Sequence, residues 1–145
     1  MKYKIKELKK KYITNELFET LSHLSDSTKT NIHKGRKIFK EIKKNKNHFI
    51  YAAIDKKSDE IIGMITLLVE PKFIHDCGYL GHIEDVVTRV GHEGQGIGKE
   101  LVKTAVKQAK KSDCYRVILN CSEDNREFYE KCGFRKKEIE MVKDL

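Results

Sequence analysis

Three glycines at alternate positions, Gly94, Gly96 and Gly98, stand directly before the run LVKTAVKQA, which has helical periodicity. The first backbone N–H groups of a helix have no partner inside it, and the helix dipole makes that end positive. Glycines let an anion approach those groups without interference from a Cβ atom. The stretch therefore predicts a polyphosphate site, with a plain glycine-rich turn as the alternative. Its GxGxG spacing matches neither a Walker loop nor the dinucleotide pattern GxGxxG.

Two adjacent acids, Glu84 and Asp85, stand in the β-branched segment HIEDVVT. A positioned carboxylate can accept or relay a proton. Neighbouring side chains point to opposite faces of a regular strand, so the two acids serve one site only if a local bulge turns one of them. Exposed acids at a strand edge are the alternative. Asn125 and Tyr129 are four residues apart, a spacing that places both side chains on one face of a helix.

A metal site is not expected. His75, Cys77 and His82 have the spacing HxCxxxxH, which fits no common zinc pattern. The four cysteines show no CxxC spacing and are expected to be reduced thiols rather than a disulfide framework. They are Cys77, Cys114, Cys121 and Cys132.

Periodicity predicts the elements that position these residues. Alternating or β-branched runs predict strands at 3–8, 48–54, 61–69, 82–88, 115–121 and 134–142. The turn DKKSDE joins the second and third of these in a hairpin. Helical spacing predicts helices at 15–24, 28–44, 96–111 and 125–132, with SDS (25–27) as a capping loop and Gly133 as the residue that ends the last helix. Residues 71–81 are predicted to be a loop. The order is β-α-α-β-β-β-α-β-α-β, a mixed α/β layout.

Composition indicates a single globular domain, residues 1–145. Hydrophobic residues make up 39% and charged residues 36% of the chain, with one proline and no internal repeat. The charged start MKYKIKELKKKY lacks the apolar segment of a signal peptide, so a cytoplasmic location without a membrane partner is expected. The net charge of +8 favours anionic partners, or it reflects solvated lysine faces spread along the chain. Nucleic acid is not expected, because no cluster of arginines with interleaved aromatic residues is visible.

Two segments resemble motifs of the GNAT superfamily of acetyl-CoA-dependent N-acetyltransferases. The loop Glu93-Gly94-Gln95-Gly96-Ile97-Gly98 resembles [Q/R]-x-x-G-x-[G/A], and NREFYEKCGF (125–134) resembles N-x-x-x-Y-x-x-x-G-F. Together with the strand order, the resemblance covers nearly the whole chain. It implies the GNAT fold, a mixed central β-sheet flanked by helices, with acetyl-CoA as co-substrate and no metal. It also implies cofactor contacts from Glu93, Gly94, Gln95, Gly96, Ile97, Gly98, Val86, Val87, Asn125 and Tyr129.

A narrower resemblance, to the glucosamine-6-phosphate N-acetyltransferases, rests on PKFIHDCGYLGHIEDVV (71–87), DCYRVILNC (113–121) and FYEKCGF (128–134). It implies direct transfer of acetyl from acetyl-CoA to the 2-amino group of glucosamine 6-phosphate, a step toward UDP-GlcNAc. It also implies a homodimer with sites at the subunit interface. The catalytic residues it implies are Glu84, Tyr129 and Asn120. The substrate contacts it implies are Ser25, Lys72, Phe73, Ile74, His75, Glu84, Asp85, Tyr115 and Arg116.

The chain departs from the pattern of these enzymes at three positions. Glu93 replaces Gln or Arg, Asn120 replaces an acid, and Asp144 replaces an arginine three residues after Met141. Outward orientation of Glu93, or a nearby Arg89 or Lys99, would relieve repulsion of a pyrophosphate. Three alternatives stay open: a GNAT enzyme for another amine such as a protein lysine or a polyamine, a basic nucleic-acid-binding module, and a GNAT fold that binds CoA without turnover.

Overall fold

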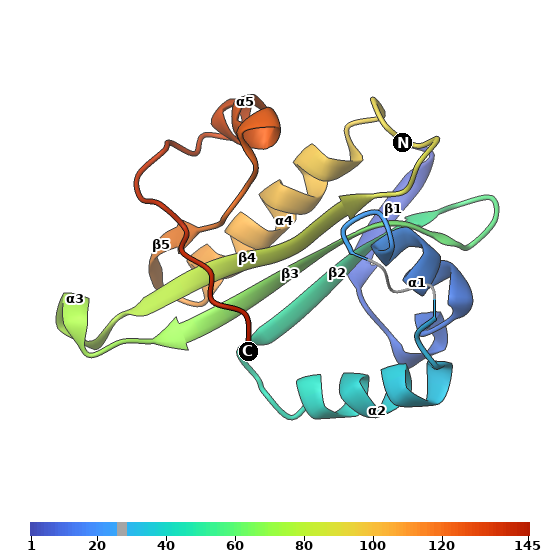
Figure 1. The fold of residues 1–145 in the computed structure, drawn as a ribbon, viewed down its shortest axis with the longest axis horizontal. Helices are drawn as coiled ribbons and strands as arrows, with labels where there is room; N and C mark the ends of the chain where they lie inside the picture. The colour runs from blue at the N-terminus through green and yellow to red at the C-terminus, as the bar shows by residue number, and fades with distance from the viewer. Residues whose placement is uncertain (26–28) are drawn as a thin grey trace.

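Five strands form one sheet in the computed structural model, which describes residues 1–25 and 29–145 (Figure 1). Their spatial order follows the chain: β1 (Tyr3–Glu7), β2 (His48–Asp55), β3 (Ile61–Pro71), β4 (Tyr79–Thr88) and β5 (Cys114–Ile118). Neighbours are antiparallel from β1 to β4. β5 runs parallel to β4, because the crossover through α4 (Ile97–Lys111) returns the chain to the same end of the sheet.

Helices cover both faces of the sheet. α1 (Asn15–Leu21) and α2 (Ile32–Ile42) lie over one face, where Leu17 packs into a buried cluster with Ile50 and Met64. α4 and α5 (Glu123–Lys131) lie over the other, where Leu101 packs against Ile65. The short helices η1 (Lys10–Tyr12) and α3 (Ile74–Cys77) complete the described elements. Since both faces are covered, the central strand β3 is a nearly continuous apolar run.

The main predicted elements form where the sequence placed them, with shifts at their ends. α2 begins at Ile32, because the Asn31 side chain caps it by accepting a hydrogen bond from the N–H of His33 (2.8 Å). The region 71–81, predicted to be a loop, contains α3 and the first residues of β4. β5 ends at Ile118 rather than at residue 121. The predicted loop 25–27 lies, except for Ser25, outside the described residues.

The last predicted strand, 134–142, is not formed, so this prediction was wrong. The chain after α5 has no helix or strand assignment. Its apolar side chains Ile139, Met141 and Val142 are 82%, 87% and 76% exposed. A strand needs a neighbour for its backbone N–H and C=O groups. The alternation of apolar and polar residues in this segment is typical of a strand, but no strand of the described chain pairs with it.

Candidate functional site

A bulge in β4 brings the two adjacent acids to the same face of the sheet. Glu84 pairs with Thr66 and Val87 with Met64, so β4 has one more residue than β3 between these pairs. Asp85 takes up the extra residue with a left-handed φ of 51°. Glu84 lies opposite Thr66, on the face that α1 and α2 cover, and Asp85 lines the cleft on that same face. The local bulge that Glu84 and Asp85 need in order to serve one site is therefore present.

That cleft, of about 700 Å³, lies between the sheet and helices α1 and α2. Its walls are largely apolar, and Asp85, Thr66 and His48 add polar groups from the sheet. Burial lowers the pKa of His48, while the nearby Asp85 carboxylate acts in the opposite direction. Sequence reasoning missed Thr66 and His48. Thr66 could have been found from the sequence, because it is the one polar residue inside the apolar run IIGMITLLV. In the structure the Thr66 side chain is buried (5% exposed).

β4 and β5 part beside the bulge. Their parallel pairing runs from Tyr79 with Cys114 to His82 with Ile118 and then stops, although β4 continues to Thr88. Beyond this point the edge of β4 has no neighbouring strand in the described chain. Val86 packs on the α4 side of the sheet and Val87 on the α1 side. The parted strands thus leave backbone groups of β4 available to an extended ligand.

The glycine stretch forms a loop at the N-terminal end of α4. Gly94 and Gly96 have φ values of +73° and +78°, a conformation that favours glycine, and a Cβ added at either would meet nothing within 4 Å. Gly96 is the N-cap of α4, and Ile97 directly after it is buried (1% exposed). The loop therefore presents open backbone at the positive end of the helix, as a phosphate cradle requires.

Gly98 has a different role from the other two glycines. A Cβ there would lie 3.1 Å from Cζ of Phe128 and 3.7 Å from Oγ1 of Thr88. Gly98 therefore lets α5 pack closely against α4 and β4, and Phe128, which sequence reasoning missed as a site-supporting residue, occupies the space. Its backbone N–H belongs to the first turn of α4, so the predicted contact of Gly98 with the cofactor stays a prediction.

Glu93 turns back into its own loop. Its Oε2 accepts a hydrogen bond from the N–H of Gly91 at 2.7 Å. Arg89 does not compensate its charge, because the guanidinium pairs with Glu19 (3.2 Å) and Glu60 (3.4 Å). The carboxylate at the entrance thus fixes the turn that precedes Gly94.

Replacing Glu93 with glutamine should leave acetyl-CoA affinity equal or raise it modestly. The amide oxygen of glutamine can still accept the Gly91 N–H, and a negative charge beside the phosphate cradle is lost. Calorimetric titration of both proteins with acetyl-CoA measures the change. Glu93→Ala is the matched variant that loses the hydrogen bond as well as the charge. A marked weakening by Glu93→Gln would show a contact that needs the carboxylate itself.

Tyr129 lies half-buried on α5, in edge contact with Phe128 (5.0 Å between centroids) and Phe134 (6.1 Å). Burial, with smaller contributions from the nearby thiols of Cys121 and Cys132, raises the pKa of Tyr129 to about 12. In residues 1–25 and 29–145 the Tyr129 hydroxyl makes no hydrogen bond. A half-buried hydroxyl that stays protonated and has no partner among the described residues is available to a ligand.

The predicted site residues around Tyr129 are mostly exposed. Asn125 is exposed on the same helix, one turn before Tyr129. It does not cap α5, because the helix begins at Glu123 and its N-cap is Ser122. Gly133 ends the helix as predicted, with φ +90° and the N–H of Phe134 donating to the carbonyl of Tyr129 (3.0 Å). Asn120 and Cys121 lie exposed in the segment that joins β5 to α5.

The predicted substrate residues Phe73, Ile74 and His75 belong to α3 and its N-cap, and α3 forms the tip of the β3–β4 hairpin (Figure 1). His75 stacks on Tyr115 with centroids 4.1 Å apart, and Arg116 follows on β5. Phe73 and Ile74 are 97% and 60% exposed. At about 3.3 Å per residue, the five residues from Tyr79 to Glu84 put roughly 16 Å between the tip and the acids. One chain does not bring these groups together.

The hairpin tip is held in a strained conformation. His75, Asp76 and Cys77 all have left-handed φ values of 53–56°, which is costly for residues with a side chain. Below the tip, Glu70 fixes Lys72 (3.1 Å) and its carboxylate lies 2.8 Å from Nε2 of His82. The hydrogen bonds from His82 and Lys72 lower the pKa of Glu70. Glu70, which sequence reasoning missed, thus holds Lys72, a predicted substrate contact, beside His82.

Within the described ranges, no group of three or more His, Cys, Asp or Glu side chains is arranged to hold a metal ion. None of the described helices is long and apolar enough to cross a membrane. The four cysteines are free thiols.

Comparisons with known proteins match both the sequence and the fold. The Acetyltransferase (GNAT) family model matches residues 13–134. Glucosamine 6-phosphate N-acetyltransferase 1 of Oryza sativa is 34% identical over 96% of this chain and 85% of its own length. The Dictyostelium discoideum protein of the same name is 40% identical over 71% of this chain and 66% of its length. The crystal structure of glucosamine-6-phosphate N-acetyltransferase from Arabidopsis thaliana aligns with a TM-score of 0.95 at 33% identity, covering 99% of each chain. The chain belongs to the acetyltransferase (GNAT) family.

Proposed function

We propose that this protein transfers the acetyl group of acetyl-CoA to the 2-amino group of glucosamine 6-phosphate. The family supplies the reaction, and the relatives that match this chain and carry this name supply the acceptor. The structural observation that carries the proposal is the bulge of β4. It sets Glu84 and Asp85 beside the point where β4 and β5 part.

The residues present fit the donor. The open backbone at Gly94 and Gly96 suits a pyrophosphate, and the unpaired edge of β4 near Val86 and Val87 suits an extended pantetheine arm. Asn125 and Tyr129, on one face of α5, would lie along that arm. The parted strands then serve as the passage through which a donor on the α4 side meets an acceptor on the α1 side.

Acetyl transfer needs a neutral amine, whereas an α-amino group with a pKa of about 8 is mostly protonated at neutral pH. Glu84, directly or through a water molecule, accepts the proton, with Asp85 beside it on the same face of β4. The amine nitrogen attacks the thioester carbonyl, and the C–S bond breaks as the tetrahedral intermediate collapses. Asn120 cannot act as a base, but its amide can hydrogen-bond sugar hydroxyls.

The Tyr129 hydroxyl stabilises the departing thiolate by donating a hydrogen bond. Full proton transfer is uphill, because its pKa of about 12 exceeds the roughly 8.5 of a simple thiol. Tyr129 thus acts as a fixed donor, and the thiol takes its proton from solvent or from the base.

The sugar phosphate is held across a dimer. Along β4, one chain leaves the hairpin tip at His75 roughly 16 Å or more from Glu84, and Arg116, which pairs with Leu80, about 13 Å from it, gaps that a single small sugar phosphate does not bridge. A second copy would place its hairpin tip at this chain's acids. The exposed tail residues Ile139, Met141 and Val142 and the exposed edge of β5 at Ile118 supply apolar surface for that contact. Burial in the dimer also accounts for a strained and exposed tip.

Light scattering at micromolar concentration should therefore give twice the chain mass of 16.9 kDa. Shared sites are tested by mixing two weak variants, Glu84→Gln and Arg116→Ala, after denaturation and refolding together. A mixed dimer has one site with both lesions and one intact site, so activity should recover to about a quarter of the wild-type level. A monomer, or a mixture no more active than its parts, would contradict shared sites.

The acceptor is identified by measuring the rate of thiol release from acetyl-CoA with different amines. Glucosamine 6-phosphate, glucosamine and a lysine peptide are compared at equal concentration. The proposal expects glucosamine 6-phosphate to be preferred by at least about tenfold in kcat/KM over glucosamine, because the phosphate contacts are charge-assisted. Preference for the peptide would assign the chain to another amine, as the departures at Asn120 and Asp144 allow. Binding of acetyl-CoA without release on any acceptor would indicate a fold without turnover.

A further inference from the structure

The positive charge of the chain is concentrated on α2 and its flanks. Lysines occur throughout the sequence, but acids elsewhere nearly balance them. Residues 29–46 contain eight basic side chains and one acid, Glu41, so this segment has a net charge of +7, compared with +8 for the whole chain. The basic residues of this segment are Lys29, Lys34, Arg36, Lys37, Lys40, Lys43, Lys44 and Lys46. The surplus is therefore local, not spread as the sequence first indicated.

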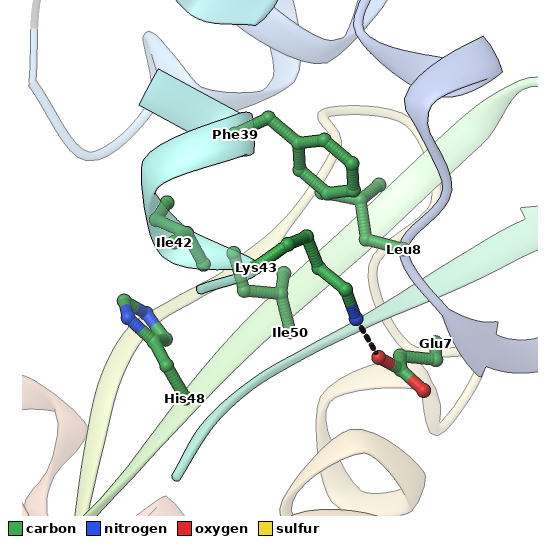
Figure 2. Close-up of a pocket in the computed structure, with 7 residues that line it drawn as sticks. All are labelled: Glu7, Leu8, Phe39, Ile42, Lys43, His48 and Ile50. Atoms are coloured by element: carbon green, nitrogen blue, oxygen red, sulfur yellow. Dashed lines mark hydrogen bonds and ion pairs between the residues drawn. The ribbon is translucent and has the colours of Figure 1, made fainter. Parts of the chain in front are cut away.

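α2 separates an apolar inner face from a basic outer face. On the inner face, Phe39 and Ile42 pack against Leu8, which follows β1, and Ile50 of β2, as Figure 2 shows. Lys43 reaches down beside them to an ion pair with Glu7. The opposite side of the helix, at 100° per residue, carries His33, Arg36, Lys37 and Lys40, and Lys44 follows in the turn after the helix. All five are exposed. The outer face is therefore held toward solvent by the packing of the inner one.

The basic side chains of the outer face are mostly not neutralised within the molecule. Of these side chains, Lys44 pairs with Glu41. In the part of the chain that the structure describes, no ion pair involves Arg36, Lys37 or Lys40. Because like charges packed on one helix face repel one another, an external anion stabilises this arrangement.

We propose that α2 docks this basic outer face on an anionic lipid surface. A group of four or more lysines and arginines on an amphipathic helix suits acidic headgroups. Ile38, at the border between the two faces of α2, is 50% exposed and can contact the acyl boundary. Nucleic acid is less well matched, because the outer face carries one arginine and, besides the small ring of His33, no aromatic side chain for base stacking. The catalytic domain thus binds peripherally through charge, which replaces the expectation of no membrane partner.

Co-sedimentation with vesicles tests the docking. Phosphatidylcholine vesicles are compared with vesicles that also contain phosphatidylserine, at low and high salt. Each basic residue near the surface contributes about fivefold to partitioning, so Lys37→Glu with Lys40→Glu should reduce it by at least about a hundredfold. Lys107→Glu with Lys110→Glu is the matched control. These lysines have the same spacing and exposure on α4 and give the same change in net charge.

The proposal expects binding only to the phosphatidylserine vesicles, loss at high salt and in the α2 variant, and retention in the α4 variant. Acetyl transfer in solution should be unchanged in both, and Lys37→Gln with Lys40→Gln repeats the test if the reversed charges impair folding. No binding of wild type, or equal loss in both variants, would overturn the assignment of α2. Tighter binding to RNA than to vesicles, lost in the same α2 variant, would assign the face to nucleic acid instead.

Discussion

Replacing Gly96 with valine should weaken acetyl-CoA binding at least about a hundredfold while the fold is retained. Gly96 has a φ of +78° at the N-cap of α4, which a β-branched residue adopts only with strain of about 1–2 kcal/mol. Its branched side chain would stand where phosphate oxygens approach the backbone, so that charge-assisted hydrogen bonds of about 1.5–3 kcal/mol each are lost. Calorimetric titration with acetyl-CoA gives the Kd, and circular dichroism reports the fold.

Gly91→Val is the matched control for Gly96→Val. Gly91 has a similar φ of +86° and equally open surroundings, but it precedes the loop and donates its N–H to Glu93. Both variants carry comparable backbone strain, and only one carries it in the cradle. Equal effects of the two substitutions, or an unchanged Kd for a folded Gly96→Val protein, would refute the assignment of the loop. Gly98→Val is unsuitable for this purpose, because its Cβ would disturb Phe128.

Replacing Tyr129 with phenylalanine should lower kcat at least about tenfold and leave acetyl-CoA affinity nearly constant. The substitution removes only a hydroxyl that has no partner in the described chain, so packing against Phe128 and Phe134 is preserved. Negative charge develops on the departing sulfur, and a positioned donor contributes typically about 10²–10⁴-fold in such steps. A fall in kcat with an unchanged Kd is the signature of a contact made in the transition state.

The protonation state of Tyr129 adds a pH test. Burial raises the pKa of Tyr129 to about 12, so the hydroxyl remains a donor through neutral and mildly alkaline pH. The ratio of wild-type to Tyr129→Phe kcat should therefore stay constant as the pH rises to about 10, the unperturbed pKa of tyrosine. A ratio that collapses near pH 7 would contradict donation by Tyr129, because the hydroxyl would lose its effect far below its pKa.

Cys121→Ala is the companion variant for the mechanism. Cys121 lies close to Tyr129, and direct transfer does not use its thiol as a nucleophile. Most activity should survive its removal. A fully active Tyr129→Phe protein together with an inactive Cys121→Ala protein would replace direct transfer by a covalent acyl-cysteine route.

The sequence by itself determined the features that depend on neighbouring residues. Alternation and helical spacing located the hairpin of β2 and β3 and the helix α4, because these patterns reflect which face of a local element is buried. The glycines of the loop before α4 could be interpreted for the same reason, because the positive φ of Gly94 and Gly96 depends only on the local turn. These local signals, with the motif at 125–134, also indicated the family.

Only the tertiary structure decided what depends on pairing between distant elements. Glu84 and Asp85 share a face because β3 sets the register that forces a bulge in β4, and no pattern within HIEDVVT specifies that register. The tail 134–142 alternates like a strand but has no neighbour in the chain, so periodicity misled there. The hairpin tip lies roughly 16 Å from the acids because strand length separates residues that sequence motifs group together. A side chain's type and spacing are local properties, whereas its partners are set by contacts made after the chain has folded back on itself.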